Sequence, residues 1–198
     1  MDRVMATLMV VADEHPTSVA DLNFTLVRPS EALRPSLRED LLETWVAVTE
    51  AGGAVGFTTP VDIAEVASRL DRALQNVAAG RDVLGILSQG DRAVGMAFLV
   101  DRGSALRRHW RTVLRVMVRP ELQGHGAGRL LLEGLHRTAR KLGLEQLQLT
   151  VRGGTGVEPF YERFGYAVVG SHPGAVRLAP GDDRDDRDRD EIMMIAWL

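Results

Sequence analysis

The clearest chemistry in this sequence is offered by a glycine-rich hexapeptide, Gln-Gly-His-Gly-Ala-Gly, at residues 123–128. Glycine lets the backbone approach a ligand closely, and the first amides of a helix that follows such a loop have no partner within the helix. Free amides at the positive end of a helix dipole attract phosphate. The hexapeptide therefore predicts a binding site for a phosphorylated cofactor.

Two common phosphate-binding motifs do not fit this hexapeptide. A P-loop requires Gly-x-x-x-x-Gly-Lys-Ser/Thr, and no such lysine follows these glycines. The dinucleotide fingerprint Gly-x-Gly-x-x-Gly, started at Gly124, would need its third glycine where Arg129 stands, and it normally opens a βαβ unit. The remaining alternative is a glycine-rich turn that binds no ligand. The segments on either side of the hexapeptide argue against this alternative.

Those flanking segments predict a strand before the hexapeptide and a helix after it. Residues 111–118 are rich in β-branched side chains, and Pro120 follows them. After the hexapeptide, apolar residues recur at helical spacing up to Gly143, namely Leu131, Leu135, Ala139 and Leu142. The loop is thus expected to join a strand to a helix start, which is where phosphate binds.

Arginine is concentrated around the predicted phosphate site. Six arginines but only one acid, Glu121, occur in the segment 107–129. Simple strand alternation would place Arg111, Arg115 and Arg119 on one solvated face, with one or two of the arginines near the phosphates. Nucleic acid is the other partner for a basic stretch, but the net charge of -3 and the aromatic content of 5% argue against it.

Composition indicates one α/β domain with a full core, because the chain has 198 residues and is 45% hydrophobic. The lack of cysteine excludes disulfides, thiolate zinc sites and an acyl-cysteine intermediate. No cluster of His, Asp and Glu suggests a metal, and no apolar run reaches the ~20 residues that cross a bilayer. We expect a cytoplasmic protein that binds no metal, membrane or nucleic acid.

Periodicity and turn signals predict the order β-α-α-β-β-β-α-β-α-β-β on one mixed sheet. Residues 1–20 are expected to be an extension, and residues 21–198 a single domain. Strands are expected at 23–28, 82–89, 93–100, 111–118, 146–151, 167–170 and 192–198, and helices at 35–50, 61–79, after the hexapeptide and at 158–164. A charged segment precedes the last expected strand. Residues 182–191 carry seven acids and three arginines, so we expect residues 178–191 to form a charged, flexible loop. The alternative is that these acids form an acidic lip that attracts a cationic substrate.

Two motifs in this order carry a family resemblance. Gln123, Gly126 and Gly128 fit the pattern Gln/Arg-x-x-Gly-x-Gly/Ala, which resembles the pyrophosphate loop of the GNAT superfamily of N-acetyltransferases. Downstream, Tyr161 and the Gly165-Tyr166 pair match most of a second GNAT pattern, A-x-x-x-Y-x-x-x-G-F. The resemblance implies a mixed α/β sheet flanked by helices and splayed between its fourth and fifth strands, with acetyl-CoA as co-substrate in the gap.

The resemblance also implies roles for particular residues in direct acetyl transfer. Tyr161 would be the general acid that protonates the departing sulfur, since a phenol with a pKa of about 10 keeps its proton at neutral pH. The backbone N–H of Val118 would bind the acetyl oxygen. Cofactor contacts are expected from Met117, Val118, Gln123, Gly124, His125, Gly126, Ala127, Gly128, Arg129 and Arg163.

Within the superfamily, residues 41–57 resemble the first helix and following loop of the tabtoxin resistance acetyltransferase group. That likeness implies antibiotic resistance through acetylation of a small primary amine, antibiotic-like, toxin-like or of amino-acid type, with residues 52–57 lining its pocket. An acceptor on a protein N-terminus or lysine, and a non-catalytic acyl-CoA sensor, are the alternatives. The expected strand at residues 192–198 could pair with the same strand of a second copy and form a homodimer, or it could be an internal strand of the sheet.

The general base is the least determined part of the site. The tabtoxin group places a carboxylate on the fifth strand, eleven residues before the tyrosine, where this chain has Thr150, which cannot act as a base at neutral pH. Glu43, Asp101 or a water chain would have to replace it. Three histidines are further titratable candidates: His109, His125 and His172.

Overall fold

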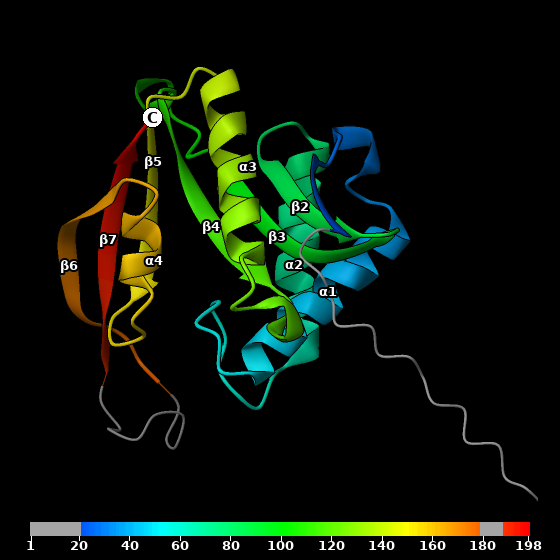
Figure 1. Ribbon diagram of the computed structural model, residues 1–198, viewed down its shortest axis with the longest axis horizontal. Helices are drawn as coiled ribbons and strands as arrows, with labels where there is room; N and C mark the ends of the chain where they lie inside the picture. Colours follow the sequence, from blue (N-terminus) through cyan, green and yellow to red (C-terminus); the bar gives the residue numbers. More distant parts are fainter. Residues whose placement is uncertain (1–20, 179–187) are drawn as a thin grey trace, which may run out of the picture.

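The computed structural model describes residues 21–178 and 188–198 and forms a seven-stranded mixed sheet in the order β1-β2-β3-β4-β5-β7-β6 (Figure 1). The expected fold class and order of elements are confirmed. The expected extension at 1–20 and most of the charged loop lie outside the described residues. The pairing of β4 with β5 is parallel, and the other neighbours pair antiparallel.

The elements follow the predicted segments with shifted ends. The strands are β1 (Leu22–Leu26), β2 (Val83–Gln89), β3 (Arg92–Val100), β4 (Trp110–Val118), β5 (Gln146–Arg152), β6 (Tyr166–Val176) and β7 (Arg189–Trp197). The helices are α1 (Pro35–Glu50), α2 (Ile63–Ala78), α3 (Ala127–Lys141) and α4 (Glu158–Glu162). Helix α2 begins later than expected because the Asp62 carboxylate caps it, accepting from the Ala64 and Glu65 amides.

The C-terminal hairpin is longer than expected. β6 continues to Val176, and β7 begins at Arg189 rather than at residue 192, because their ladder extends to the pair Val176↔Arg189. The last three residues of the expected charged loop are therefore strand. β7 lies between β5 and β6, so it is the internal strand, and both of its edges are occupied within this chain.

The sheet opens between β4 and β5. These strands pair only over Trp110↔Gln146, Arg111↔Leu147 and Thr112↔Gln148, and the rest of each strand diverges. On its other side β4 shifts register against β3 between Met96 and Phe98, and Arg115 in the bulge has φ +56°. Such a bulge bends a strand and increases its twist, which carries the end of β4 away from β5.

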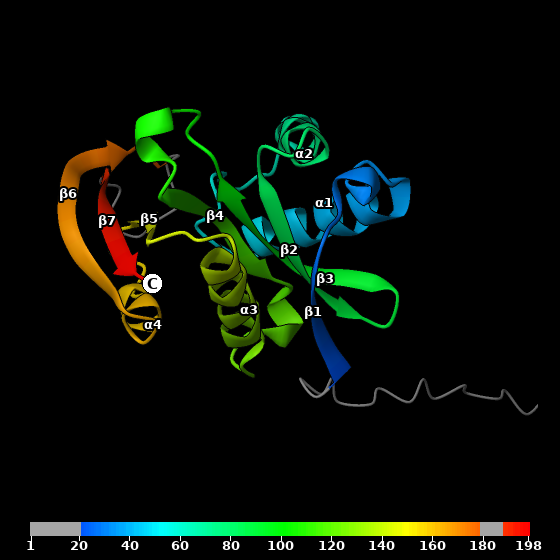
Figure 2. The same ribbon diagram turned by 90° about the horizontal axis from the view of Figure 1, so that it is seen from above.

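Two hydrophobic cores lie on opposite faces of the sheet. α1 and α2 cover one face, and α3 covers the other (Figure 2). Trp45, Leu70 and Phe98 belong to the core beneath α1 and α2. Leu131, Leu147 and Tyr166 belong to the core beneath α3, against which Tyr161 of α4 also packs. A ligand in the opening between β4 and β5 would consequently meet both faces of the sheet.

A buried polar pair joins α3 to β6. His136 is 5% exposed, and its Nε2 lies 3.1 Å from the Tyr166 hydroxyl. Burial, with a smaller contribution from nearby Arg140, lowers the pKa of His136 to about 4. His136 is therefore neutral in the folded protein at neutral pH, although it would titrate near 6.5 in the unfolded chain.

This difference predicts an acid-sensitive step in stability. Between pH 6.5 and 4 the unfolded chain binds a proton that folded His136 does not, so stability falls as pH falls, by about 3 kcal/mol over the window. The measurement is the free energy of unfolding by urea at several pH values. His136→Gln keeps a hydrogen-bonding side chain beside Tyr166 but cannot titrate, so its profile should be flatter. The control is the exposed His172→Gln, which should keep the wild-type slope; parallel profiles for wild type and His136→Gln would refute the assignment.

Candidate functional site

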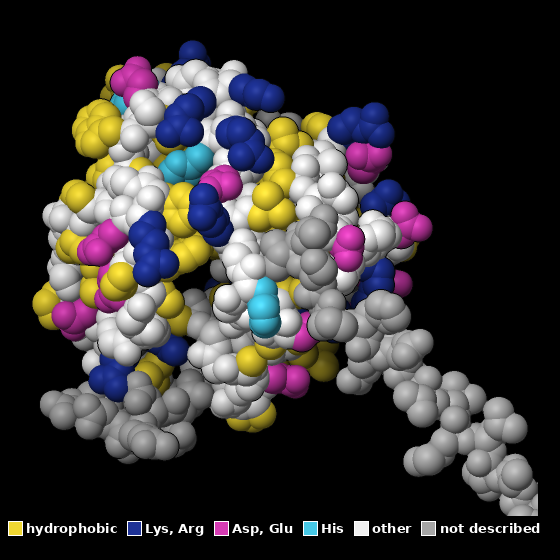
Figure 3. Space-filling view, in the orientation of Figure 1, with side chains coloured by type: hydrophobic (Ala, Val, Ile, Leu, Met, Phe, Trp, Pro, Cys, Tyr) yellow, Lys and Arg dark blue, Asp and Glu magenta, His cyan; other side chains and the backbone are white. Residues whose placement is uncertain are grey.

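A cavity of about 1480 Å³ fills the opening between β4 and β5. The space-filling view shows the molecule hollowed between the half that carries β5–β7 and the half that carries α3 (Figure 3). The cavity wall combines the C-terminal part of β4, the glycine loop, β5, α4 and the α1–α2 connection. The two sequence motifs, which are far apart in the chain, therefore face one space.

The glycine loop has the backbone geometry of an anion site. Gly124 and Gly126 adopt φ values of +76° and +94°, which side chains with a Cβ rarely adopt. The first backbone hydrogen bond of α3 is donated by Leu130 to the Gly126 carbonyl, so the preceding helical amides have no acceptor within the helix. Gln123 Nε2 donates to the Val118 carbonyl at 2.9 Å and thereby fixes the loop to the end of β4.

Most of the predicted cofactor residues line this cavity. They are Met117, Val118, Gln123, Gly124, Gly126, Gly128, Arg129 and Arg163. The side chains of the other two do not: His125 is exposed, and Ala127, the first residue of α3, is buried in the core between α3 and the sheet. Any contact from these two residues would thus come from the backbone of the loop.

The pairing of β4 directs one backbone amide into the opening. Arg119 N–H donates to the Val94 carbonyl of β3. Val118, one residue before Arg119, lies opposite Gly95 of β3. Hydrogen-bonding groups alternate in direction along an antiparallel strand, so the Val118 N–H points away from β3 toward the gap. By the same alternation the backbone of Met117 faces Met96 on β3, and Met117 lines the cavity with its side chain.

Tyr161 is presented to the cavity by the short helix α4. Its ring packs against Phe160 and Tyr166, with centroids 5.1 and 5.7 Å apart. Burial raises the pKa of Tyr161 to about 12. Among the described residues no side chain hydrogen-bonds its hydroxyl, so a protonated phenol is available to a ligand.

A carboxylate that the sequence analysis missed stands beside Thr150. Leu149 and Val151 of β5 point into the core beneath α3, so Thr150 between them points to the opposite face. There its hydroxyl donates to Glu191 Oε1 at 3.0 Å, and both residues line the cavity. Glu191 comes from β7, in the charged stretch where a loop was expected. The continuous apolar run at residues 192–198 was the sequence signal for its strand.

The other proposed bases lie elsewhere. Glu43 pairs with Arg92 and Arg119, and Asp101 pairs with Arg111, outside the cavity wall. Three histidines are also absent from the wall: His109, His125 and His172. Asp62, Glu65 and Glu133 also line the cavity, but they cap α2 or pair with Arg69 and Arg129, whereas Glu191 of β7 is the acid that contacts Thr150.

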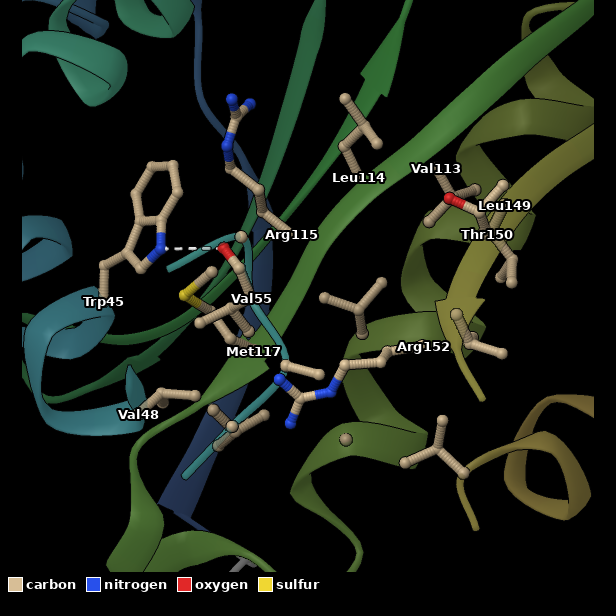
Figure 4. Close-up of a pocket in the computed structure, with 18 of the residues that line it drawn as sticks. Trp45, Val48, Val55, Val113, Leu114, Arg115, Met117, Leu149, Thr150 and Arg152 are labelled. Carbon is tan, nitrogen blue, oxygen red and sulfur yellow. Dashed lines mark hydrogen bonds between the residues drawn. The ribbon is translucent and has the colours of Figure 1, made fainter. Parts of the chain in front are cut away.

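The α1–α2 connection, the start of α2 with Arg69, and Arg115 of β4 form the wall on the face of α1 and α2. Trp45 Nε1 donates to the Val55 carbonyl at 3.1 Å, and Gly53 to Thr58 line the cavity, in line with the expected pocket loop (Figure 4). The expectation of one solvated arginine face on β4 was wrong. The bulge puts Arg115 on the same side as Leu114, with its guanidinium 4.8 Å from the Trp45 ring centroid.

Within residues 21–178 and 188–198, no group of three or more His, Cys, Asp or Glu residues could hold a metal ion. No helix there is long and apolar enough to span a membrane.

Comparison with solved structures shows the same fold. A GNAT-family acetyltransferase from Streptococcus pneumoniae superimposes with a TM-score of 0.68 and 17% identity, over 89% of this chain and 99% of that one. YncA, an acetyltransferase from Salmonella typhimurium solved with acetyl-CoA, gives 0.64 and 18%, over 90% and 94%. The ribosomal-protein-S18-alanine N-acetyltransferase of Escherichia coli gives 0.61 and 19%, over 89% and 93%.

The family model of the GNAT acetyltransferase domain matches residues 34–175, which include α1, the splayed strands, the glycine loop and Tyr161. The match covers well over half of the chain. The chain therefore belongs to the GNAT family of acetyltransferases and is an acyltransferase that uses acetyl-CoA as its donor.

Proposed function

We propose that this protein transfers an acetyl group from acetyl-CoA directly to the primary amine of a small molecule. The observation that carries the proposal is one cavity whose wall holds the glycine loop and Tyr161 together with the Thr150–Glu191 pair. Donor and acceptor can then be bound at once, and no cysteine is present to carry the acetyl group in between. Cytoplasmic action on an antibiotic-like, toxin-like or amino-acid-type amine is part of the proposal.

Each step of the transfer has a candidate group in this cavity. The free amides at the start of α3 bind the pyrophosphate of the donor. The Val118 N–H binds the acetyl oxygen as negative charge develops on it. Glu191, oriented by Thr150, accepts a proton from the acceptor ammonium so that the neutral amine attacks the carbonyl carbon. The C–S bond then breaks, Tyr161 donates its proton to the departing sulfur, and the proton that the attacking nitrogen loses as the amide forms passes through water to the Tyr161 phenolate.

A small acceptor fits the wall better than a protein chain does. The connection between α1 and α2 is held against α1 by the Trp45–Val55 hydrogen bond and by edge-to-face contact between Trp45 and Phe57, at 5.5 Å. It borders the cavity where an extended peptide would need an open groove. An acceptor on a protein N-terminus or lysine, and a non-catalytic sensor, are the alternatives that acetylation assays separate.

The role of Tyr161 predicts a selective loss of turnover. Tyr161→Phe removes the proton donor and keeps the ring, so kcat should fall by about 10²-fold, the scale of general acid catalysis, with little change in the KM for acetyl-CoA. Release of the CoA thiol in steady state measures both. Tyr166→Phe is the matched control, because it removes a hydroxyl that bonds His136 in the core and should leave kcat near wild type. Unchanged turnover in Tyr161→Phe would exclude this role.

The glycine loop predicts a loss of donor affinity without steric conflict. No atom lies within 4 Å of a Cβ added at Gly126, so Gly126→Ala acts only through its left-handed φ. Restoring that conformation costs about 1–2 kcal/mol, which corresponds to roughly tenfold weaker acetyl-CoA binding by calorimetry. Gly90→Ala, with φ +57° in the β2–β3 turn, is the control: it should lower stability and keep the affinity. Equal affinity in both variants would argue against a phosphate site here.

The assignment of Glu191 predicts a loss that depends on its charge. Glu191→Gln keeps the size of the side chain but removes the base, so kcat/KM for the amine should fall by about 10²-fold while acetyl-CoA affinity holds. Thr150→Val removes the orienting hydroxyl and should give a smaller loss. Glu162→Gln, an exposed change outside the cavity wall, serves as control. Full activity of Glu191→Gln with an amine substrate would show that another group takes the proton.

A further inference from the structure

A single arginine occupies an unusual position on the wall opposite the glycine loop. Arg115 sits in the bulge of β4 with φ +56° and lines the cavity. Its guanidinium lies 4.8 Å from the Trp45 ring centroid and 5.6 Å from that of Phe98, both in the core beneath α1 and α2. In the close-up Arg115 stands beside Trp45, with Thr150 on the facing strand (Figure 4).

Arg115 differs from the arginines near it on β4 in its electrostatic surroundings. Arg111 pairs with Asp101, and Arg119 pairs with Glu121, whereas Arg115 forms no ion pair with any carboxylate of the residues described. Two cations, Arg69 and Arg72, oppose its charge, and Asp82 favours it without forming an ion pair with it. Partial burial is the main reason that the pKa of the Arg115 guanidinium is lowered, and the charges of Arg69 and Arg72 add to this effect.

The aromatic contacts do not compensate this arrangement. A cation–π contact is weak, and the rings offer the guanidinium neither a counterion nor an acceptor in its own plane. Guanidinium also has a planar set of N–H donors that matches a carboxylate in a bidentate pair. An anion entering the cavity would supply both the charge and the missing acceptors.

The phosphates of the donor are not that anion. The glycine loop leads into α3, which covers one face of the sheet, whereas Arg115 points to the other face, beneath α1. Arg115 is three residues from Val118 along β4, about 10 Å of strand. The anionic group at Arg115 and the reacting amine near Val118 can accordingly belong to one small molecule.

We propose that Arg115 binds the carboxylate of the acceptor, so that the substrates of this enzyme are amino acids or close analogues with a free carboxylate. The inference rests on the proposed function and narrows its acceptor. The apolar wall beside Arg115, formed by Val55, Phe57 and Leu114, favours an apolar side chain on that acceptor.

The test compares acceptors with and without a free carboxylate. Wild-type enzyme is assayed for release of the CoA thiol with L-leucine, L-methionine and L-phenylalanine, and with the amide of each. The amides should show at least tenfold lower kcat/KM, chiefly through a higher KM. Arg115→Met keeps an apolar side chain over Trp45, so it should lose the preference for the free acids while acetyl-CoA affinity is retained. The control Arg72→Met, at an exposed position outside the wall, should keep the preference.

The outcomes separate this inference from the proposed function. Acetylation of the amides as efficiently as of the acids, or of polyamines only, would overturn the carboxylate site and leave N-acetyl transfer standing. An unchanged preference in Arg115→Met would also overturn it. Binding of acetyl-CoA without acetylation of any amine tested, these or a wider set, would overturn the proposed function itself. Loss of the preference in Arg115→Met alone, with retained donor affinity, would support the assignment.

Discussion

The candidate site depends on the early end of the backbone hydrogen-bond ladder between β4 and β5. β4 and β5 share three residue pairs, and beyond Thr112↔Gln148 their backbones face an opening instead of each other. Unpaired backbone groups inside a protein are costly unless a partner satisfies them. A ligand that carries amides and carbonyls can take the place of the absent strand, as in β-augmentation. The same break that costs sheet stability thus leaves the Val118 N–H unpaired in the sheet, and we propose that it forms the donor site.

The break also joins two faces of the sheet that are otherwise separate. The amides of the glycine loop attract anions at the start of α3, and the guanidinium of Arg115 does so beneath α1. The sheet keeps these two places apart, so in the proposed mechanism a phosphorylated donor and a carboxylate acceptor would not compete for one charge. They meet only in the opening, where Val118, Tyr161 and Glu191 line the same cavity. Direct transfer follows from this geometry more naturally than sequential binding at one site.

How much could be predicted from the sequence depended on the distance between interacting residues. The glycine loop and the element order were predictable because Gln123, Gly126 and Gly128 are local signals in a strand–loop–helix context. The position of Arg115 was not, because the bulge arises from register against β3, which alternation along β4 cannot reveal. The Thr150–Glu191 contact joins residues 41 apart, and the acid-rich composition around Glu191 hid the start of β7.

The environment of Tyr161 raises its pKa and so limits when it can donate its proton in the proposed reaction. With a pKa of about 12 it is protonated throughout the physiological range. A thiol in water has a pKa of about 8.5, so full transfer of this proton to a free thiolate would be uphill by roughly 5 kcal/mol. The desolvation that raises the pKa of Tyr161 also destabilises a thiolate formed beside it, which narrows this gap. Tyr161 therefore acts to best effect while the C–S bond is breaking, when its hydrogen bond stabilises charge that water cannot reach.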